Sequence, residues 1–354
     1  MNRSGLVTER LHNQKLSTPD FRKPVEVVRW FGAVQSQDFE AAKWALALRM
    51  PSATSNDIEK AFNNGQIVRT HLMRPTWHFV AHDDVRWLLD LTAPRVNLRC
   101  GPNYRKLELD DAVFKRSRKV LENALKNGEY RTRAELRRRL SESGIEANDT
   151  IRLAHILIRA ELDGIICSGP RIGKQFTYAL LEERVVGTKK IDRDEALAKL
   201  TRCYFRSHGP ASLQDFVWWS GLSVAEAKRG IELLARHLEK TEVGEKDYWT
   251  LRSSKALPES LNFAHLLPVY DEFFVAYKDR HVVFDPEDDK PALTSWALLG
   301  PTVIVNGIAV GTWKRTTDKK SIEVQLISPV KKTQRAAIDQ AVTRYTKFLE
   351  LKST

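Results

Sequence analysis

The sequence predicts a mixed α+β protein, mainly α, with three tandem winged-helix domains followed by a C-terminal β-barrel-like domain. One order of elements, with successive helices closed by a hairpin, occurs twice along the chain. In both copies, helices begin at capping signatures in matching places. From about residue 263 onwards, the helical periodicity of apolar residues is replaced by short β-rich runs. The 354 residues are enough for several domains of ordinary size.

These patterns predict four domains. We expect a first winged helix with helical extensions over 1–108, a second over 109–188, a third over 189–258, and the β-barrel-like domain with a terminal helix over 259–354.

The first domain contains the least regular copy of the pattern. Pro24 suits the first turn of a helix, and Ser55 is expected to cap another that stops at Gly65. Apolar and polar residues alternate on either side of Arg74-Pro75, which predicts a hairpin followed by a helix.

The second domain shows the order most clearly. A helix over 110–127 stops at Gly128, and Thr132 with Glu135 forms a capping box for the next helix. Asn148 or Asp149 starts a longer helix, and 165–181 reads as two short strands around a Gly/Pro-rich turn.

The third domain repeats this order. A helix ends at Gly209, Ser212 pairs with Asp215 and Ser223 with Glu226 as capping signatures, and a hairpin turns near Gly244. We expect Trp218-Trp219 to be part of its core.

The C-terminal domain is predicted to hold short strands with turns at Asn306-Gly307 and Thr317-Asp318, and a helix over 332–351. For Asp271 and Glu272, at the start of this region, we expect a structural ion pair with Lys278 or Arg280 rather than a catalytic role.

Composition favours a soluble nucleic-acid-binding protein. The formal charge is +12, because 57 Lys and Arg outnumber 45 Asp and Glu, and this excess suits a polyanion such as double-stranded DNA. No signal peptide or membrane span is recognisable. Three distant cysteines without a CxxC pair indicate thiols in a reducing, cytoplasmic setting. Histidine spacing predicts no metal, and we expect no cofactor.

Basic side chains are concentrated where a winged helix would meet phosphates. The candidates in the second domain are Arg131, Arg133, Arg137, Arg138, Arg139, Arg171 and Lys174, of which some must face water. In the first hairpin, His71, Arg74 and Thr76 are candidate DNA contacts, whereas His78 between two aromatic residues fits a buried position.

The tripeptide Gln35-Ser36-Gln37 follows the first predicted helix. In an extended segment, Gln35 and Gln37 project to the same side, and two carboxamides can hold one water between them. On spacing alone, ordinary loop glutamines explain them better. Asp38 is expected to be an N-cap rather than a catalytic group.

Four stretches resemble, in the same order and over nearly the whole chain, the winged-helix DNA glycosylase family that contains AlkZ and YcaQ. They are VVRWFGAVQSQDFEAAKWALALR, RTHLMRPTWHFV, LLPVYDEFFVAYKDR and VNGIAVGTWKR. The resemblance implies three winged helices and a β-barrel in a C-shape around duplex DNA, and excision of N7-alkylated purines, with unhooking of interstrand crosslinks in some members. It also implies that Gln35 and Gln37 are the catalytic Gln-x-Gln pair. Ser36 stands where that family has an aliphatic residue, and the YcaQ branch has Asp at the position of Gln37.

Two other functions fit the same modules. A non-catalytic DNA-binding transcription regulator would use winged helices alone, because fold does not determine chemistry. A protein–protein scaffold is the third, and the positive charge argues against it. Neither a dimerisation helix nor an effector domain is evident, so we expect a monomer.

Overall fold

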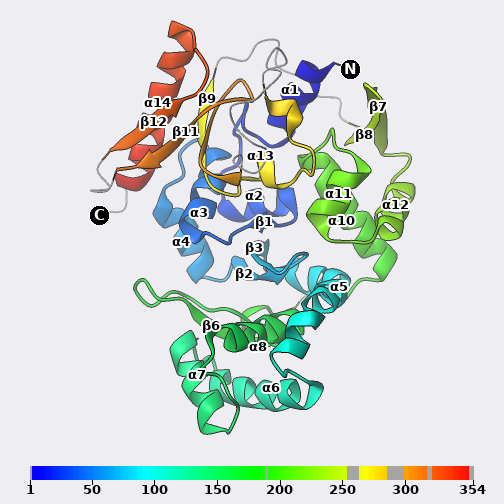
Figure 1. Cartoon of the computed structure of the whole chain (residues 1–354), viewed down its shortest axis with the longest axis vertical. Helices are drawn as coiled ribbons and strands as arrows, with labels where there is room; N and C mark the ends of the chain where they lie inside the picture. The colour runs from blue at the N-terminus through cyan, green and yellow to red at the C-terminus, as the bar shows by residue number, and fades with distance from the viewer. Residues whose placement is uncertain (1, 188–189, 253–262, 285–298, 317–320, 351–354) are drawn as a thin grey trace. The chain divides into compact units, whose positions relative to one another are not determined.

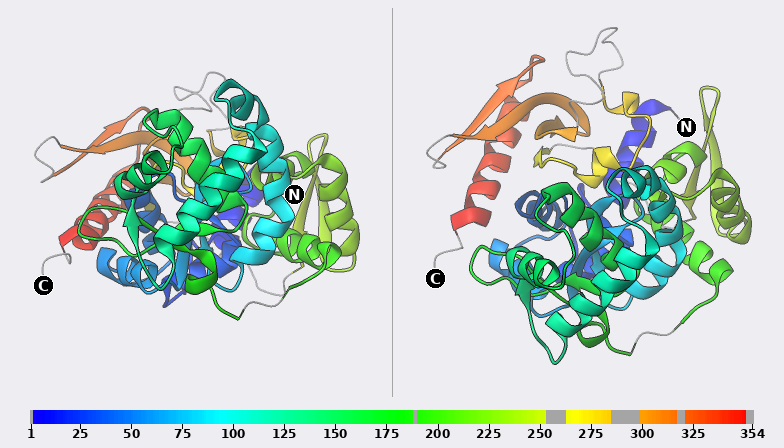
Figure 2. Two further views of the ribbon diagram at one scale, coloured as in Figure 1. Left: turned by 90° about the horizontal axis from the view of Figure 1, so that it is seen from below. Right: turned by 60° about the horizontal axis from the view of Figure 1, so that its bottom comes forward.

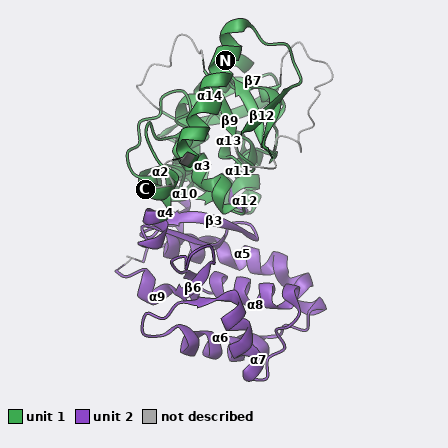
Figure 3. Ribbon diagram, turned by 90° about the vertical axis from the view of Figure 1, so that its left-hand side faces the viewer, with its two compact units in different colours: residues 1–59, 198–219, 223–354 green, residues 60–197, 220–222 purple. Residues whose placement is uncertain are grey.

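The computed structural model describes residues 2–187, 190–252, 263–284, 299–316 and 321–350. These residues form two compact units, coloured separately in Figure 3. Unit 1 contains residues 1–59, 198–219 and 223–354, and unit 2 contains residues 60–197 and 220–222. The expected four-domain division remains a prediction, and its edges at 188/189 and 258/259 lie outside the described residues.

Unit 2 contains a two-stranded hairpin, a cluster of helices and a small sheet (Figure 1). Strands β4, β6 and β5 form a three-stranded sheet in that order, and β2 pairs antiparallel with β3. Its elements are β2 (Ile67–Leu72), β3 (Thr76–Ala81), α5 (Val85–Lys106), α6 (Asp111–Leu125), β4 (Arg131–Thr132), α7 (Arg133–Glu142), α8 (Thr150–Leu162), β5 (Ile166–Ser168), β6 (Thr177–Leu180) and α9 (Leu181–Arg184). Helix α4 (Ser55–Asn63) contains the boundary between the units.

Unit 1 brings the two ends of the chain into one body. Its N-terminal elements are α1 (Arg3–Asn13), α2 (Pro24–Phe31), β1 (Val34–Gln35) and α3 (Phe39–Leu48). Later in the chain come α10 (Arg193–Ser207), α11 (Leu213–Ser220), α12 (Val224–Leu233), β7 (Leu238–Val243) and β8 (Lys246–Leu251), except that residues 193–197 of α10 and residue 220 of α11 belong to unit 2. Its C-terminal elements are β9 (Ala264–Leu267), α13 (Glu272–Val275), the 3-10 turn η1 (His281–Val283), β10 (Thr302–Val305), β11 (Ile308–Arg315), β12 (Ile322–Leu326) and α14 (Lys332–Glu350).

Helix α14 lies along the four-stranded sheet of unit 1, as the views of Figures 1 and 2 agree. Tyr345 on α14 packs against the rings of Trp44 and Trp313, at centroid distances of 4.9 and 4.8 Å. Arg344 donates to the carbonyl oxygens of Ala47 and Met50 at 3.0 Å each, and so satisfies the C-terminal end of α3. The last helix thereby stabilises the helix that follows the Gln35-Ser36-Gln37 segment.

The mixed, mainly helical fold class is confirmed, and most predicted helix starts are present. Thr132 with Glu135 and Ser223 with Glu226 form complete capping boxes, and the side chain of Asp149 caps α8. Pro24 occupies the first turn of α2. Grouping these elements into three winged helices remains a prediction.

Two details of the expectation were wrong. The cap of α4 is Thr54 rather than Ser55, because the Thr54 hydroxyl accepts the Asp57 N–H at 3.1 Å while the Asp57 carboxylate accepts the Thr54 N–H at 2.9 Å. Residues of the DEFFV stretch form the short helix α13 instead of a strand, because Asp271 caps them by accepting the Phe273 N–H at 2.9 Å.

The C-terminal strands do not close into a barrel within the described residues. Their order is β12-β11-β10-β9, so β9 and β12 are the two edges of an open sheet. Closure usually takes five or more strands, with about eight in small barrels. Asn306 and Gly307 have φ of 51° and 85°, which confirms the predicted two-residue turn; the turn expected at Thr317-Asp318 lies outside the described residues.

Buried positions account for several single-residue expectations. Of the two tryptophans expected in the core, Trp219 is fully buried in unit 1 whereas Trp218 is partly exposed. Cys100, Cys167 and Cys203 are buried free thiols. Burial raises the pKa of the Cys167 thiol to about 12, so it stays protonated at neutral pH. Among the described helices, none has both the length and the apolar character that a membrane crossing requires.

Candidate functional site

The Gln35-Ser36-Gln37 segment connects α2 to α3 within unit 1. Gln35 ends the short strand β1 and is 7% exposed, Ser36 is fully buried, and Gln37 is exposed. Burial does not alternate along this segment: Gln35 and Ser36 both lie in the protein interior, Ser36 at the position where the resembling family has an aliphatic side chain. Of the two glutamines, Gln37 faces solvent and Gln35 is buried.

Both ends of this segment are held by local structure. Helix α2 stops at Gly32, whose φ of 85° suits glycine, and an added Cβ would lie 3.2 Å from Cys203 Cβ. At the other end, the Asp38 carboxylate accepts the Ala41 N–H at 2.9 Å, which confirms Asp38 as the N-cap of α3. The carboxylate beside the motif is thus engaged in a helix cap.

A buried carboxylate holds the backbone of the motif. Oε1 of Glu272, a residue only 1% exposed, accepts the backbone N–H of Gln35 at 2.8 Å. Its Oε2 accepts the indole N–H of Trp219 at 3.0 Å and lies 3.3 Å from Nε2 of His208. Such fully hydrogen-bonded burial is what a carboxylate needs in a low-dielectric interior.

His208 completes this buried network. Burial lowers the pKa of His208, against the opposing influence of Glu272, so the ring is mostly neutral at pH 7. Its Nδ1 lies 2.8 Å from the hydroxyl of Ser207, which also donates to the carbonyl oxygen of Cys203 at 2.6 Å. The Ser-His-Glu sequence of contacts resembles a catalytic triad, but the fully buried Ser207 bonds the helix backbone, so the network is structural.

Asp271 also has a structural role, with a different partner from the one expected. Its carboxylate makes a bidentate ion pair with Arg49, at 2.6 and 2.8 Å, and both residues are 1% exposed. Arg49 also donates to Gln14 Oε1 at 3.0 Å. Lys278 and Arg280 are not the partners of Asp271, because its capping of α13 turns the side chain towards the C-terminal end of α3.

In unit 2, the β2–β3 hairpin places its candidate residues in unequal positions. His78 is fully buried, as expected, and burial lowers its pKa well below the usual value. Arg74 and Thr76 are partly exposed near the hairpin turn. His71 is 4% exposed, and its backbone N–H donates to Glu161 Oε2 at 2.8 Å while its ring bonds the same oxygen.

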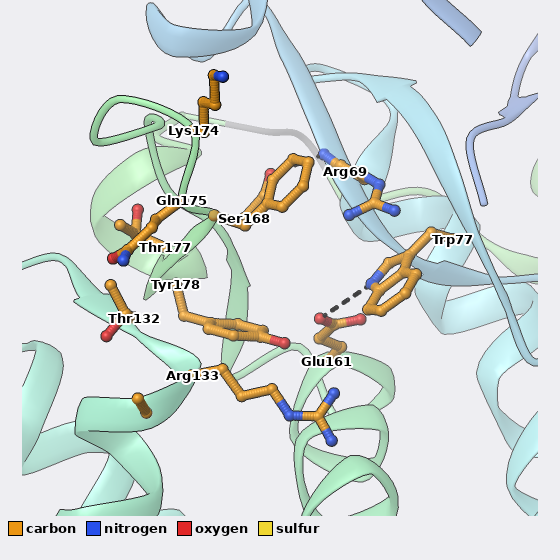
Figure 4. A pocket seen from close by; sticks show the side chains of 12 residues that line it. Arg69, Trp77, Thr132, Arg133, Glu161, Ser168, Lys174, Gln175, Thr177 and Tyr178 are labelled. Carbon is orange, nitrogen blue, oxygen red and sulfur yellow. Dashed lines mark hydrogen bonds between the residues drawn. The ribbon is translucent and has the colours of Figure 1, made fainter. Parts of the chain in front are cut away.

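Glu161 lies beside a cavity of unit 2 that combines aromatic and charged side chains (Figure 4). The cavity has a volume of about 400 Å³. It is lined by Arg69, Trp77, Thr132, Arg133, Ala134, Glu161, Ser168, Lys174, Gln175, Phe176, Thr177 and Tyr178. Two of the predicted DNA contacts, Arg133 and Lys174, therefore belong to one concave site.

The remaining basic candidates of unit 2 have local partners or face solvent. Arg131 contacts Glu129 at 2.6 Å, and Arg171 donates to the carbonyl oxygen of Lys174 at 3.1 Å. Arg137 is exposed on α7. Arg138 and Arg139 both face solvent, and each lies within 4 Å of Glu142. This agrees with the expectation that some of the arginines on this helix contact water.

Comparison with known proteins identifies the family. A model of the DNA glycosylase AlkZ-like family matches residues 28–348. The chain belongs to this family. The matched range includes the Gln35-Ser36-Gln37 segment of unit 1 and the whole of the cavity in unit 2, so the resemblance seen in the sequence is confirmed.

Two relatives show how far the family likeness extends. The interstrand DNA cross-link repair glycosylase of Streptomyces sahachiroi is 23% identical over 327 residues, which is 86% of this chain and 85% of that protein. The solved structure of Streptomyces sahachiroi DNA glycosylase AlkZ matches with a TM-score of 0.80 at 19% identity, covering 98% of this chain and 97% of that one. The AlkZ-like fold is thus shared at low sequence identity.

Sequence reasoning missed two residues of these sites. Glu272 was assigned an ion pair, and Glu161 was not singled out. Each lies within an apolar or ordinary amphipathic run, so no local spacing marks it. The available signal was a charged residue at a predicted core position, which requires a partner from elsewhere in the fold.

Proposed function

We propose that this chain hydrolyses the N-glycosidic bond of cationic N7-alkylated purines in double-stranded DNA, with Gln35 and Gln37 positioning the attacking water. Alkylation at N7 gives the base a positive charge, so it leaves without being protonated. The protein then has to place a water at the sugar and stabilise an oxocarbenium-like transition state.

The observation that supports this chemistry best is that the carboxylates nearest to the motif accept hydrogen bonds in structural roles. Glu272 accepts hydrogen bonds from the Gln35 backbone and the Trp219 indole, and Asp38 caps α3. A neutral leaving group would demand a carboxylate acting as base together with an acid. Carboxamides can orient a water but are poor bases, which suits labile, cationic lesions over uracil or hypoxanthine.

DNA binding is proposed for the basic side chains of unit 2, with the protein acting as a monomer. The proposed phosphate contacts are Arg74, Thr76, Arg131, Arg133, Arg137, Arg171 and Lys174. His71 stays a candidate only if its contact with Glu161 opens on binding.

Interstrand crosslinks are a second proposed substrate. The Streptomyces sahachiroi relative is named as an interstrand DNA cross-link repair glycosylase, and crosslinks through N7 of purines carry the same cationic leaving group. Duplexes crosslinked through N7 should be separated into single strands under denaturing conditions after incubation with the protein.

Release of N7-methylguanine from a defined duplex tests the proposal. The wild-type chain should release the base and leave alkali-labile sites, whereas Gln35→Ala/Gln37→Ala should bind the same duplex and release base at least a hundredfold more slowly. Gln340→Ala, an exposed glutamine on α14, is the matched control and should behave as wild type.

Two results would reject the catalytic proposal. Base release by the double variant at the wild-type rate would remove the glutamines from the mechanism. Salt-sensitive DNA binding by the wild type without release from any alkylated duplex would favour the non-catalytic DNA-binding regulator.

A further inference from the structure

The cavity of unit 2 is built from five separate stretches of the chain. The β2–β3 hairpin, the N-terminal turn of α7, helix α8, strand β5 and the segment 174–178 all contribute side chains (Figure 4). Its volume of about 400 Å³ is within the usual range of small-ligand sites, about 300–1,000 Å³. A cleft of this size at the meeting point of five stretches is large enough for one nucleotide unit.

A hydrogen-bond acceptor lies at the inner side of this cavity. Glu161 is 1% exposed, and its Oε2 is occupied by the backbone N–H and the ring of His71. Its Oε1 accepts a long hydrogen bond of 3.5 Å from the Trp77 indole N–H, drawn as a dashed line in Figure 4. A carboxylate has about four acceptor positions, so Oε1 has capacity for N–H donors of a ligand.

Aromatic side chains form the walls. Trp77 and Phe176 are partly exposed, and Tyr178 is 8% exposed. The Arg69 guanidinium lies 4.2 Å from the centroid of the Trp77 ring and 4.9 Å from that of Phe176. Burial raises the pKa of the Tyr178 hydroxyl, so it is a neutral donor or acceptor. Such flat apolar surfaces suit a planar ring, because stacking of a base on an aromatic side chain contributes about 1–3 kcal/mol.

Positive charge lies at the outer part of the site. Lys174 is exposed, and Arg133 is partly exposed, with one guanidinium nitrogen donating to the Thr150 carbonyl at 2.8 Å. With Arg69, these cations outnumber the single carboxylate of the lining. An anionic group attached to the planar ring is therefore favoured at the mouth.

We infer that this cavity binds a guanine nucleotide, with the base against Trp77 and Tyr178, its N–H edge on Glu161 and its phosphate near Lys174. Guanine presents N1–H and the N2 amino group side by side, and a carboxylate oxygen can accept from both. Adenine and the pyrimidines lack this pair of adjacent donors. The nucleotide is either part of a DNA strand, unstacked from its neighbours, or free in solution.

This inference rests on the proposed function in one respect, which is that DNA is a source of the nucleotide. The cavity itself is separate from the proposed catalytic motif, because no residue of its lining belongs to the Gln35-Ser36-Gln37 segment. The Gln35→Ala/Gln37→Ala protein should bind the mononucleotide as the wild type does. Loss of base release and loss of nucleotide binding are therefore separable failures.

Isothermal titration calorimetry of the full chain at low ionic strength with deoxyguanosine monophosphate tests the inference. We expect saturable binding, at least tenfold weaker for deoxyadenosine and deoxycytidine monophosphates and none with inorganic phosphate. Glu161→Gln should weaken binding by about tenfold or more, as loss of a charge-assisted hydrogen bond does. A competition experiment then distinguishes a nucleotide of a DNA strand from a free nucleotide. If an oligothymidylate carrying one guanine displaces deoxyguanosine monophosphate and plain oligothymidylate does not, the source is a DNA strand.

A second variant protects the test against misfolding of Glu161→Gln. Lys174→Gln changes an exposed side chain and should weaken the binding of deoxyguanosine monophosphate several-fold while leaving the affinity for deoxyguanosine unchanged. Lys115→Gln, on the exposed face of α6, should change neither affinity. Equal affinity for all mononucleotides, binding of phosphate alone, or wild-type affinity in a folded Glu161→Gln protein would overturn the inference.

Discussion

The backbone N–H of Gln35 donates to Oε1 of Glu272 at 2.8 Å, across 237 residues of sequence. The same carboxylate accepts from the indole of Trp219. Glu272 thus joins the N-terminal, middle and C-terminal segments of unit 1 at the position of the proposed catalytic motif. A carboxylate beside a proposed catalytic segment is a candidate for a chemical role, but its contacts with Gln35 and Trp219 lead us to propose a positioning role.

Replacing Glu272 by Gln should weaken both stability and base release. A carboxamide has one acceptor oxygen, so either the Gln35 N–H or the Trp219 N–H would face an NH₂ group. The free energy of unfolding should fall by about 1–3 kcal/mol, and base release should slow while the dissociation constant for DNA changes less than twofold. Urea denaturation and single-turnover assays measure the two effects, with Glu122→Gln on exposed α6 as control. Unchanged release by the variant would exclude the positioning role.

The buried Arg49–Asp271 pair predicts strong non-additivity. Arg49→Met leaves the Asp271 carboxylate buried without its cation, which should lower the free energy of unfolding by about 3–5 kcal/mol. In Arg49→Met/Asp271→Leu, neither charge remains, so the loss should be smaller than the sum of the single losses. A double-mutant cycle by urea denaturation measures the coupling; additive losses would show that the pair does not interact energetically.

Buried histidines should make stability depend on pH below neutrality. Burial, with the nearby charge of Arg344, lowers the pKa of His265 to about 4, whereas an unfolded histidine titrates near 6.5. Between these pH values the unfolded chain binds the proton and the folded chain does not. The contribution of His265 to the free energy of unfolding is therefore fully present above about pH 6.5 and is lost as the pH falls towards 4. The loss should reach about 3 kcal/mol for this residue.

Urea denaturation between pH 4 and 7 measures this dependence. His265→Gln retains a donor for the Leu16 carbonyl oxygen, which Nε2 contacts at 2.9 Å in the wild type, and should flatten part of the slope. The remainder should persist, because burial also lowers the pKa values of His78 and His208. An identical slope in the variant would show that His265 does not contribute.

The exposed cations of unit 2 predict a measurable change in the salt dependence of DNA binding. Arg137→Gln and Lys174→Gln should each weaken binding equally for all sequences and reduce the slope of log K against log salt by about 1. Arg118, which pairs with Glu122 on α6, serves as control when changed to Gln. Fluorescence anisotropy at several salt concentrations measures the slopes, and equal slopes in all three variants would remove these positions from the interface.

Local signals predicted the elements better than the sites. Thr132, Asp149 and Ser223 begin helices because a side-chain oxygen and an N–H a few residues later are all that a cap requires. Glu161 and Glu272 have no such local mark. Their partners are His71 and Gln35, which are 90 and 237 residues away, and only packing brings them together.

The sequence by itself determined where helices and hairpins begin, the excess of positive charge, and the Gln35-Ser36-Gln37 segment with its capping Asp38. These depend on contacts within a few residues or on composition alone. Tertiary structure alone decided that the described C-terminal strands form an open sheet, that Arg49 rather than Lys278 or Arg280 meets Asp271, and that a carboxylate contacts the backbone of the motif. The physical reason is that burial of a charge makes a distant partner obligatory without indicating in the sequence which residue it is.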